Sequence, residues 1–170
     1  MSAAAGYPSV ALWLQPLSAP LTELELKDTQ AKGLALERLA MYFCWLLDLQ
    51  FRGWRRRGKE TLGAEVDMLA EAARLVFTRW QIQCKNTNRV TLDHVAREVG
   101  IAVKLKPHVI LIVTSGRVGD EAREYASGIM KETHLNIAFV DKDDLKRIAA
   151  VLKREAENAM QIKAIGVPEE

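Results

Sequence analysis

Apolar residues recur at the spacing of a buried helical face in four parts of the chain. The first helix is expected to begin near Thr22. The second can be capped by Thr91 and stops before Pro107, because proline disfavours helical geometry in the residue before it. The third covers about 120–133, and Asp143 can cap the fourth. After Gly33 one face of the first helix is apolar: Leu36, Leu39, Ala40, Phe43 and Leu47.

Strands are predicted in the intervening segments. Residues 64–71 and 74–85 alternate between polar and apolar side chains and have only a turn between them, so we expect a hairpin. The apolar runs 109–113 and 135–140 also predict strands, and the β-branched residues of the first are typical of a strand buried on both faces. Residues 49–60 fit a short strand followed by a basic loop.

The resulting order of elements is α, β, β, β, α, β, α, β, α, which predicts a single α/β domain with a mixed sheet. A chain of 170 residues has room for one domain with its own core and is short for two. We assign residues 22–165 to this domain, 1–21 to an N-terminal arm or linker, and 166–170 to a C-terminal tail.

Composition narrows the class of protein only a little. Apolar residues make up 49% and charged residues 27%, which is ordinary for a globular domain, and a net charge of +2 does not by itself imply nucleic acid. Cys44 and Cys84 fit buried thiols in a reducing compartment. The apolar stretch 39–47 is shorter than the roughly 20 residues of a membrane span, and no signal peptide is recognisable. We therefore expect a cytoplasmic protein.

Polar side chains gather on one face of the predicted hairpin. Residues two apart in a strand point the same way, so Gln81, Gln83 and Lys85 share a face, opposite the packing face of their strand. On the preceding strand, Glu65 and Asp67 also share a face. Carboxylates can then meet an amide and an ammonium across the sheet. A hydrolytic nuclease needs such groups, because oxygen ligands hold Mg²⁺ and a lysine orients or deprotonates the attacking water.

These residues resemble a known family. The segments 63–71 and 80–86 resemble the core of the PD-(D/E)xK nuclease superfamily, and most closely its Mrr-type, or type IV-like, restriction endonucleases, in which Gln replaces an acidic residue. The Asp…Gln-x-Lys pattern is met by Asp67, Gln83 and Lys85, although Val66 stands where the superfamily's name has proline. The family's αβββαβ core order matches residues from about 32 to 114. The resemblance implies a restriction-endonuclease-like fold, with a mixed central sheet flanked by helices.

The resemblance also implies roles for individual residues. Asp67 would be the main ligand of Mg²⁺, or of Mn²⁺ as a substitute, with the Gln83 side chain and the Cys84 backbone carbonyl as further ligands. Lys85 would act on the nucleophilic water, and Glu37 matches the helical glutamate that often completes such sites. The implied activity is metal-dependent endonucleolytic hydrolysis of DNA, in restriction or defence against foreign DNA.

Some neighbouring residues remain open between a functional and an ordinary role. Glu65 is an additional ligand or a solvent-facing neighbour, and Thr114 and Ser115 bind phosphate or cap the helix after residue 120. A basic segment after the first strand is either a solvated loop or a grip on DNA phosphates, and we favour DNA because it leads into the strand of Asp67. Its basic residues are Arg52, Arg55, Arg56, Arg57 and Lys59.

Other functions with the same fold stay in view. A Holliday-junction or repair nuclease would use the same chemistry, and a non-catalytic DNA-binding module would keep the fold alone. Residues 90–100 resemble the opening of a helix-turn-helix domain, but no recognition helix follows Gly100. DNA is the expected partner. A homodimer would allow both strands to be cut, with the apolar island around Trp13 as a contact, and nucleases of this type are often joined to a recognition or sensing module.

Overall fold

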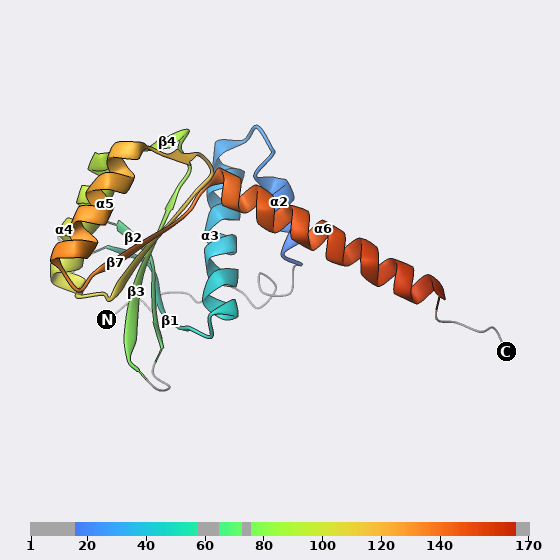
Figure 1. The fold of residues 1–170 in the computed structure, drawn as a ribbon, viewed down its shortest axis with the longest axis horizontal. Helices are drawn as coiled ribbons and strands as arrows, with labels where there is room; N and C mark the ends of the chain where they lie inside the picture. Colours follow the sequence, from blue (N-terminus) through green and yellow to red (C-terminus); the bar gives the residue numbers. More distant parts are fainter. Residues whose placement is uncertain (1–15, 58–64, 73–75, 166–170) are drawn as a thin grey trace, which may run out of the picture.

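A five-stranded mixed sheet lies at the centre of the fold, with strand order β1-β2-β3-β5-β7 (Figure 1). The computed structural model describes residues 16–57, 65–72 and 76–165. β1, β2 and β3 are antiparallel neighbours, and β3, β5 and β7 run parallel. The strands are β1 (Gln50–Arg57), β2 (Glu65–Ala72), β3 (Thr78–Lys85), β5 (Val109–Thr114) and β7 (Asn136–Val140).

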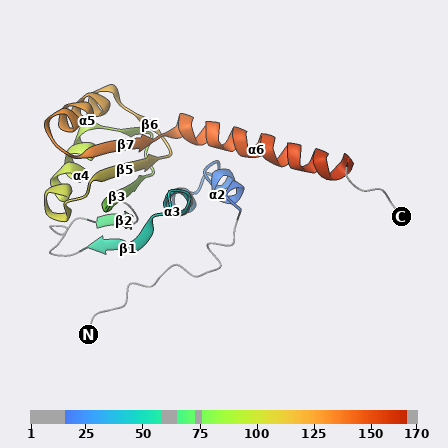
Figure 2. The same cartoon turned by 60° about the horizontal axis from the view of Figure 1, so that its bottom comes forward.

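Helices cover both faces of this sheet. One face packs against α3, with the short α2 and the start of α6 beside it, and the other packs against α4 and α5 (Figure 2). The far part of α6 extends away from the sheet in both views. Among the described residues, no helix is long and apolar enough to cross a membrane. The helices are α2 (Ser18–Glu23), α3 (Thr29–Leu46), α4 (Leu92–Leu105), α5 (Asp120–Glu132) and α6 (Lys142–Ile165).

The architecture confirms the predicted fold class, including the strand pairs around the site. β2 and β3 form the expected antiparallel pair, although residues 73–75 between them lie outside the described part. β5 lies between β3 and β7, with helices on both faces, as its apolar run predicts. Two short parallel strands, β4 (Arg89–Val90) and β6 (Arg117–Val118), were not predicted. A strand of two residues is too short to show a periodic pattern.

The first long helix begins later than predicted. Asp28 caps α3 by accepting hydrogen bonds from the backbone N–H groups of Gln30 (2.8 Å) and Ala31 (3.4 Å), so α3 begins at Thr29. Residues 18–23 form the separate helix α2 instead. The predicted burial of Leu47 is wrong. It lies just past the last residue of α3, and 52% of its surface is exposed.

The basic segment and the last helix also differ from expectation. Residues 50–57 form the continuous strand β1, paired with β2 up to Arg57, where a short strand and a loop were expected. The strand continues through the arginines because it pairs with a neighbouring strand, and strand formation depends on such context more than on local preference. The cap of α6 is Asp141, whose Oδ1 accepts from the N–H groups of Asp143 (2.9 Å) and Asp144 (3.3 Å). Asp143 lies within the first turn of the helix.

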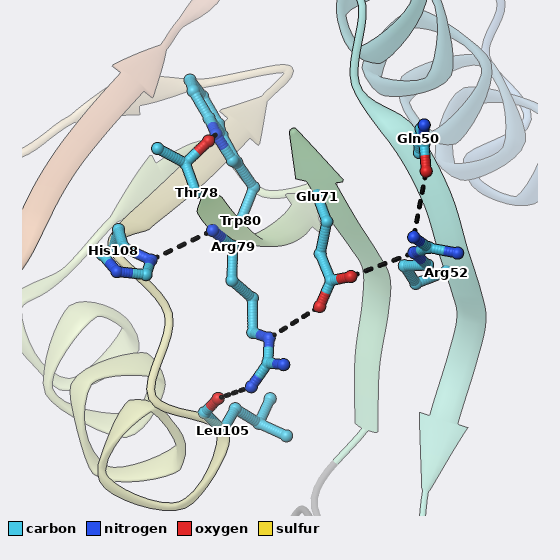
Figure 3. A network of polar contacts seen from close by, with 8 residues as sticks. All are labelled: Gln50, Arg52, Glu71, Thr78, Arg79, Trp80, Leu105 and His108. Atoms are coloured by element: carbon cyan, nitrogen blue, oxygen red, sulfur yellow. Dashed lines mark hydrogen bonds and ion pairs between the residues drawn. The ribbon is translucent and has the colours of Figure 1, made fainter. Parts of the chain in front are cut away.

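A polar network fixes the end of the sheet where β2 stops and β3 starts (Figure 3). The Glu71 carboxylate accepts hydrogen bonds from the Nε atoms of Arg52 (3.0 Å) and Arg79 (2.9 Å). Arg79 also donates to the carbonyl of Leu105 at the end of α4 (3.0 Å), and its backbone N–H donates to Nδ1 of His108 (3.0 Å). The network joins β1, β2, β3 and α4, so it holds the strands of the candidate site in register.

Candidate active site

The candidate site lies where β2 and β3 stop pairing as a ladder. Their last backbone pair is Met68↔Ile82, and beyond it the two strands are joined by the side chain of Asp67. Asp67 Oδ2 accepts hydrogen bonds from Gln83 Nε2 (2.8 Å) and from the backbone N–H of Cys84 (2.7 Å). The predicted Asp67 and Gln83 therefore meet directly, on the shared face that strand alternation indicates.

The environment of Asp67 disfavours a bare negative charge. The pKa of its carboxyl is raised from 3.8 to about 6, chiefly by burial and also by the nearby carboxylates of Glu37 and Glu65, against the lowering effects of the Cys84 N–H and the Lys85 ammonium. A positive charge placed beside Asp67 would relieve this cost. The site is therefore prepared electrostatically for a cation.

Glu37 approaches the site from α3 and is almost fully buried. Its Oε2 accepts a hydrogen bond from Trp54 Nε1 (2.8 Å), and its Oε1 accepts from the guanidinium of Arg55 (2.7 Å). Arg55 has a left-handed backbone, with a φ of 45°. Such a conformation is uncommon for residues other than glycine and is found at constrained functional positions. Glu37 is thus fixed beside the site, where its charge acts on Asp67.

Gln83 supplies an oxygen with no partner in the described part of the chain. Its Nε2 is engaged by Asp67, while its Oε1 is buried and makes no hydrogen bond. A buried acceptor left unpaired is costly. No group of three His, Cys, Asp or Glu residues in the described ranges can hold a metal ion, so a cation here would need amide or backbone oxygens beside Asp67. The unpaired Gln83 oxygen fits a hard, oxygen-binding cation such as Mg²⁺.

Lys85 forms an ion pair that sequence reasoning missed. Its Nζ lies 3.1 Å from Oε1 of Glu98, a residue of α4 whose side chain is 1% exposed. Glu98 Oε2 accepts from Gln81 Nε2 (3.0 Å). A signal was present in the sequence, because Glu98 falls three residues from both Val95 and Ile101 and so interrupts the apolar face of its helix.

The polar face of β3 is therefore covered rather than solvated. Gln81 is fully buried beneath α4 and also donates to the backbone carbonyl of Glu98 (3.2 Å). Its neighbour in the parallel register is Ile110, and the neighbour of Gln83 is Ile112. Polar groups of the site thus adjoin the apolar core between the sheet and the helices α4 and α5.

The five basic residues expected to bind DNA are not all placed at the site. Arg55 is connected to the site because its guanidinium forms an ion pair with Glu37. Arg52 instead contacts Glu71 and Gln50 at the other end of β2 (Figure 3). The backbones of Arg56 and Arg57 belong to β1, but their side chains and the whole of Lys59 lie outside the described part of the structure. Their DNA-binding role stays a prediction.

Side chains at the end of β5 support the strand that carries Lys85. Thr114 Oγ1 donates to the Lys85 carbonyl (2.8 Å), and Ser115 Oγ donates to Asn86 Oδ1 (2.8 Å). Neither residue caps the next helix, since Gly119 is the N-cap of α5. A Cβ on Gly116 would collide with the backbone of residues 87 and 88, so this turn requires glycine. These contacts tie the end of β3 to the end of β5.

Comparison with known proteins supports the same fold and activity class. The family model described as "Restriction endonuclease", for the Mrr-type catalytic domain, matches residues 33–149. Searches of curated proteins and of solved structures find no match. The matched range includes α3 with Glu37, the strands of Asp67, Gln83 and Lys85, and the helix of Glu98.

Proposed function

Because the chain belongs to the Mrr-type restriction endonuclease family, we propose that it is a divalent-metal-dependent endonuclease whose site is formed by Asp67, Gln83, Cys84, Lys85 and Glu37. Membership shows a nuclease of the restriction endonuclease type acting on DNA. The metal, these residue roles and a role in defence against foreign DNA are the proposed part, as is a cytoplasmic location.

The proposal rests chiefly on one observation: a buried carboxyl with a raised pKa lies next to an amide group whose oxygen has no hydrogen-bond partner among the described residues. Asp67 is buried among other carboxylates, and Gln83 Oε1 beside it has no donor in the described residues. Asp67, Gln83 Oε1 and the Cys84 carbonyl would hold Mg²⁺, with Mn²⁺ as a substitute. Such an ion lowers the pKa of bound water and neutralises the phosphodiester.

The remaining residues orient the reacting groups. The Lys85 ammonium acts electrostatically on Asp67, and its role in this proposal is to orient the attacking water and to offset negative charge on the phosphate. Glu37 adds a second fixed carboxylate, whose two oxygens are already held by Trp54 and Arg55. Hydrolysis would follow by in-line attack of the oriented water on phosphorus: the new P–O bond forms as the bond to the leaving oxygen breaks, the water's proton passes to solvent, and the leaving oxygen takes up a proton from solvent.

The proposal is tested by incubating the protein with plasmid, linear and branched DNA in Mg²⁺, Mn²⁺ or EDTA. We expect cutting that needs the metal and falls at least 100-fold in Asp67→Asn and in Lys85→Met. Glu124→Gln, which changes an exposed carboxylate on α5, serves as the matched control and should cut normally. Metal-dependent cutting that survives both site variants would contradict the site, and cutting confined to branched DNA would indicate a junction resolvase.

A further inference from the structure

Glu98 is a charged residue in an apolar place. It lies on the face of α4 that buries Val95, Ile101 and Ala102, and only 1% of its surface is exposed. The two residues of β5 that neighbour the polar face of β3, Ile110 and Ile112, are fully buried as well. Burying a carboxylate in such surroundings is costly unless the charge is paired and hydrogen-bonded.

Both oxygens of Glu98 are in use. Oε1 pairs with Lys85 Nζ at 3.1 Å, and Oε2 accepts from Gln81 Nε2 at 3.0 Å. Gln81 also donates to the backbone carbonyl of Glu98, which ties the helix to β3 at the same point. With one oxygen held by an amide, the carboxylate cannot rotate freely, so the position of its other oxygen is fixed for Lys85.

The geometry determines where the Lys85 ammonium lies. Gln81 and Lys85 are four residues apart on β3, roughly 13 Å at the usual rise of a strand. Their side chains nevertheless meet one carboxylate, so both lean toward Gln83, which lies between them on the same face. The ammonium is thereby drawn over the part of the strand where Gln83 contacts Asp67.

Stability alone does not explain this ion pair. Removing two charges from water offsets most of their attraction, and apolar residues of similar size often serve a fold equally well. A leucine at position 98 would complete the apolar face of α4. Keeping Glu98 instead gives the Lys85 side chain one defined orientation, which matters if Lys85 takes part in the reaction.

We propose that Glu98 is the positioning residue of this nuclease, and that it holds Lys85 against α4 in the orientation required at the scissile phosphate. This inference rests on the proposed function. It assigns Glu98 no contact with DNA or metal. Its loss should therefore lower kcat while leaving both the KM for DNA and the metal concentration needed for half-maximal rate within about two-fold.

The test compares Glu98→Gln with Val95→Ala in the full chain. The first keeps shape but removes the charge that holds Lys85, and the second removes buried volume from the same face of α4 without touching Lys85. We expect kcat to fall 10- to 100-fold in Glu98→Gln and less than two-fold in Val95→Ala, at a temperature where both are folded. Equal losses in the two variants, or full kcat in Glu98→Gln, would overturn the inference.

A thermal double-mutant cycle gives a readout independent of cutting. In the unchanged protein, Lys85→Met should lower the unfolding midpoint, because it leaves the buried Glu98 charge without its ion-pair partner. In the Glu98→Gln variant, where this charge is already absent, the same substitution should lower the midpoint less than half as much. If the two substitutions lower the midpoint additively, Lys85 and Glu98 are not coupled, and the inference fails even if the protein cuts DNA. If the coupling is present but the unchanged protein cuts no DNA with any metal, the proposed function fails, and the catalytic part of this inference fails with it.

Discussion

Asp67 illustrates how a residue proposed to bind a metal can lower the stability of the fold. Its pKa is raised in the folded state to about 6, from 3.8, chiefly by burial. A raised carboxyl pKa means that the folded state binds the proton more tightly than the unfolded state does. The cost to stability is absent below about pH 4 and fully present above about pH 6. A cation at the site would remove this cost.

Replacing Asp67 by asparagine should therefore stabilise the protein while abolishing cleavage. In EDTA at pH 8 we expect the free energy of unfolding to rise by about 1–2 kcal/mol, somewhat less than a rise of the Asp67 pKa from 3.8 to about 6 allows, because asparagine makes weaker hydrogen bonds. The gain should shrink as the pH is lowered toward 4. Denaturant titration at pH 8, 6 and 4 measures it, with Glu124→Gln as control. A gain that grows as pH falls would show that burial does not raise this pKa.

The residues of the site differ in how readily the sequence reveals them. Strand alternation places Gln83 and Lys85 on one face, the resemblance to the Mrr-type family picks them out together with Asp67, and the structure brings Asp67 and Gln83 into contact. Glu98 was not predicted as a residue of the site. The buried face of α4 is identified by its apolar residues, so the one charged residue on that face is overlooked. Its pairing with Lys85 depends on how a helix lies over a distant strand, which no local pattern encodes.

At the level of elements, the position of Glu37 depends on where α3 begins. The Asp28 side chain accepts two backbone N–H groups at the start of this helix, and Glu37 follows two turns later, held by Trp54 and Arg55 of β1. Asp28 is exposed and makes no contact with the site. The cap can therefore be tested apart from the chemistry.

Asp28→Ala should lower the free energy of unfolding by about 1 kcal/mol, the usual loss when a helix cap is removed. Asp28→Asn keeps an acceptor oxygen and should lose less than half as much. Urea denaturation followed by circular dichroism measures both. Cutting at 25 °C should change less than two-fold in either variant, and a large loss of cutting in Asp28→Asn would mean that Asp28 has a role beyond the helix.

Helices and strands with a clear periodic pattern of apolar residues were predicted well. Elements whose bounds depend on contacts with other parts of the chain were not. α4, α5, β5 and β7 lie within one or two residues of expectation, because each combines a clear apolar pattern with a recognisable end. The length of β1 could not be read from its arginine-rich sequence, since it is set by pairing with β2. The cap of α6 was displaced by two residues because Asp141, Asp143 and Asp144 are equally good cap residues.

For the whole molecule, the proposed metal site predicts that metal binding and folding are linked. An ion that binds only the folded chain stabilises it by about 2.7 kcal/mol at a concentration of 100 times its Kd. For a domain of this size that corresponds to an increase of roughly 5–10 °C in the unfolding midpoint. We expect Mg²⁺ to raise the midpoint of the unchanged protein and to have little effect on Asp67→Asn. Equal shifts in both proteins would place the ion elsewhere.

The outer edge of the sheet bears on how copies of this chain associate. β1 is the terminal strand of the sheet order, so one side of it lacks a strand partner in the described residues. Its hydrogen-bonding row is interrupted by the irregularity between Phe51 and Gly53 and by the left-handed backbone of Arg55. Such interruptions protect an open edge from pairing with a foreign strand. The left-handed backbone at Arg55, whose guanidinium holds Glu37, therefore also disfavours a continuous intermolecular sheet, and with it amyloid-like aggregation through this edge.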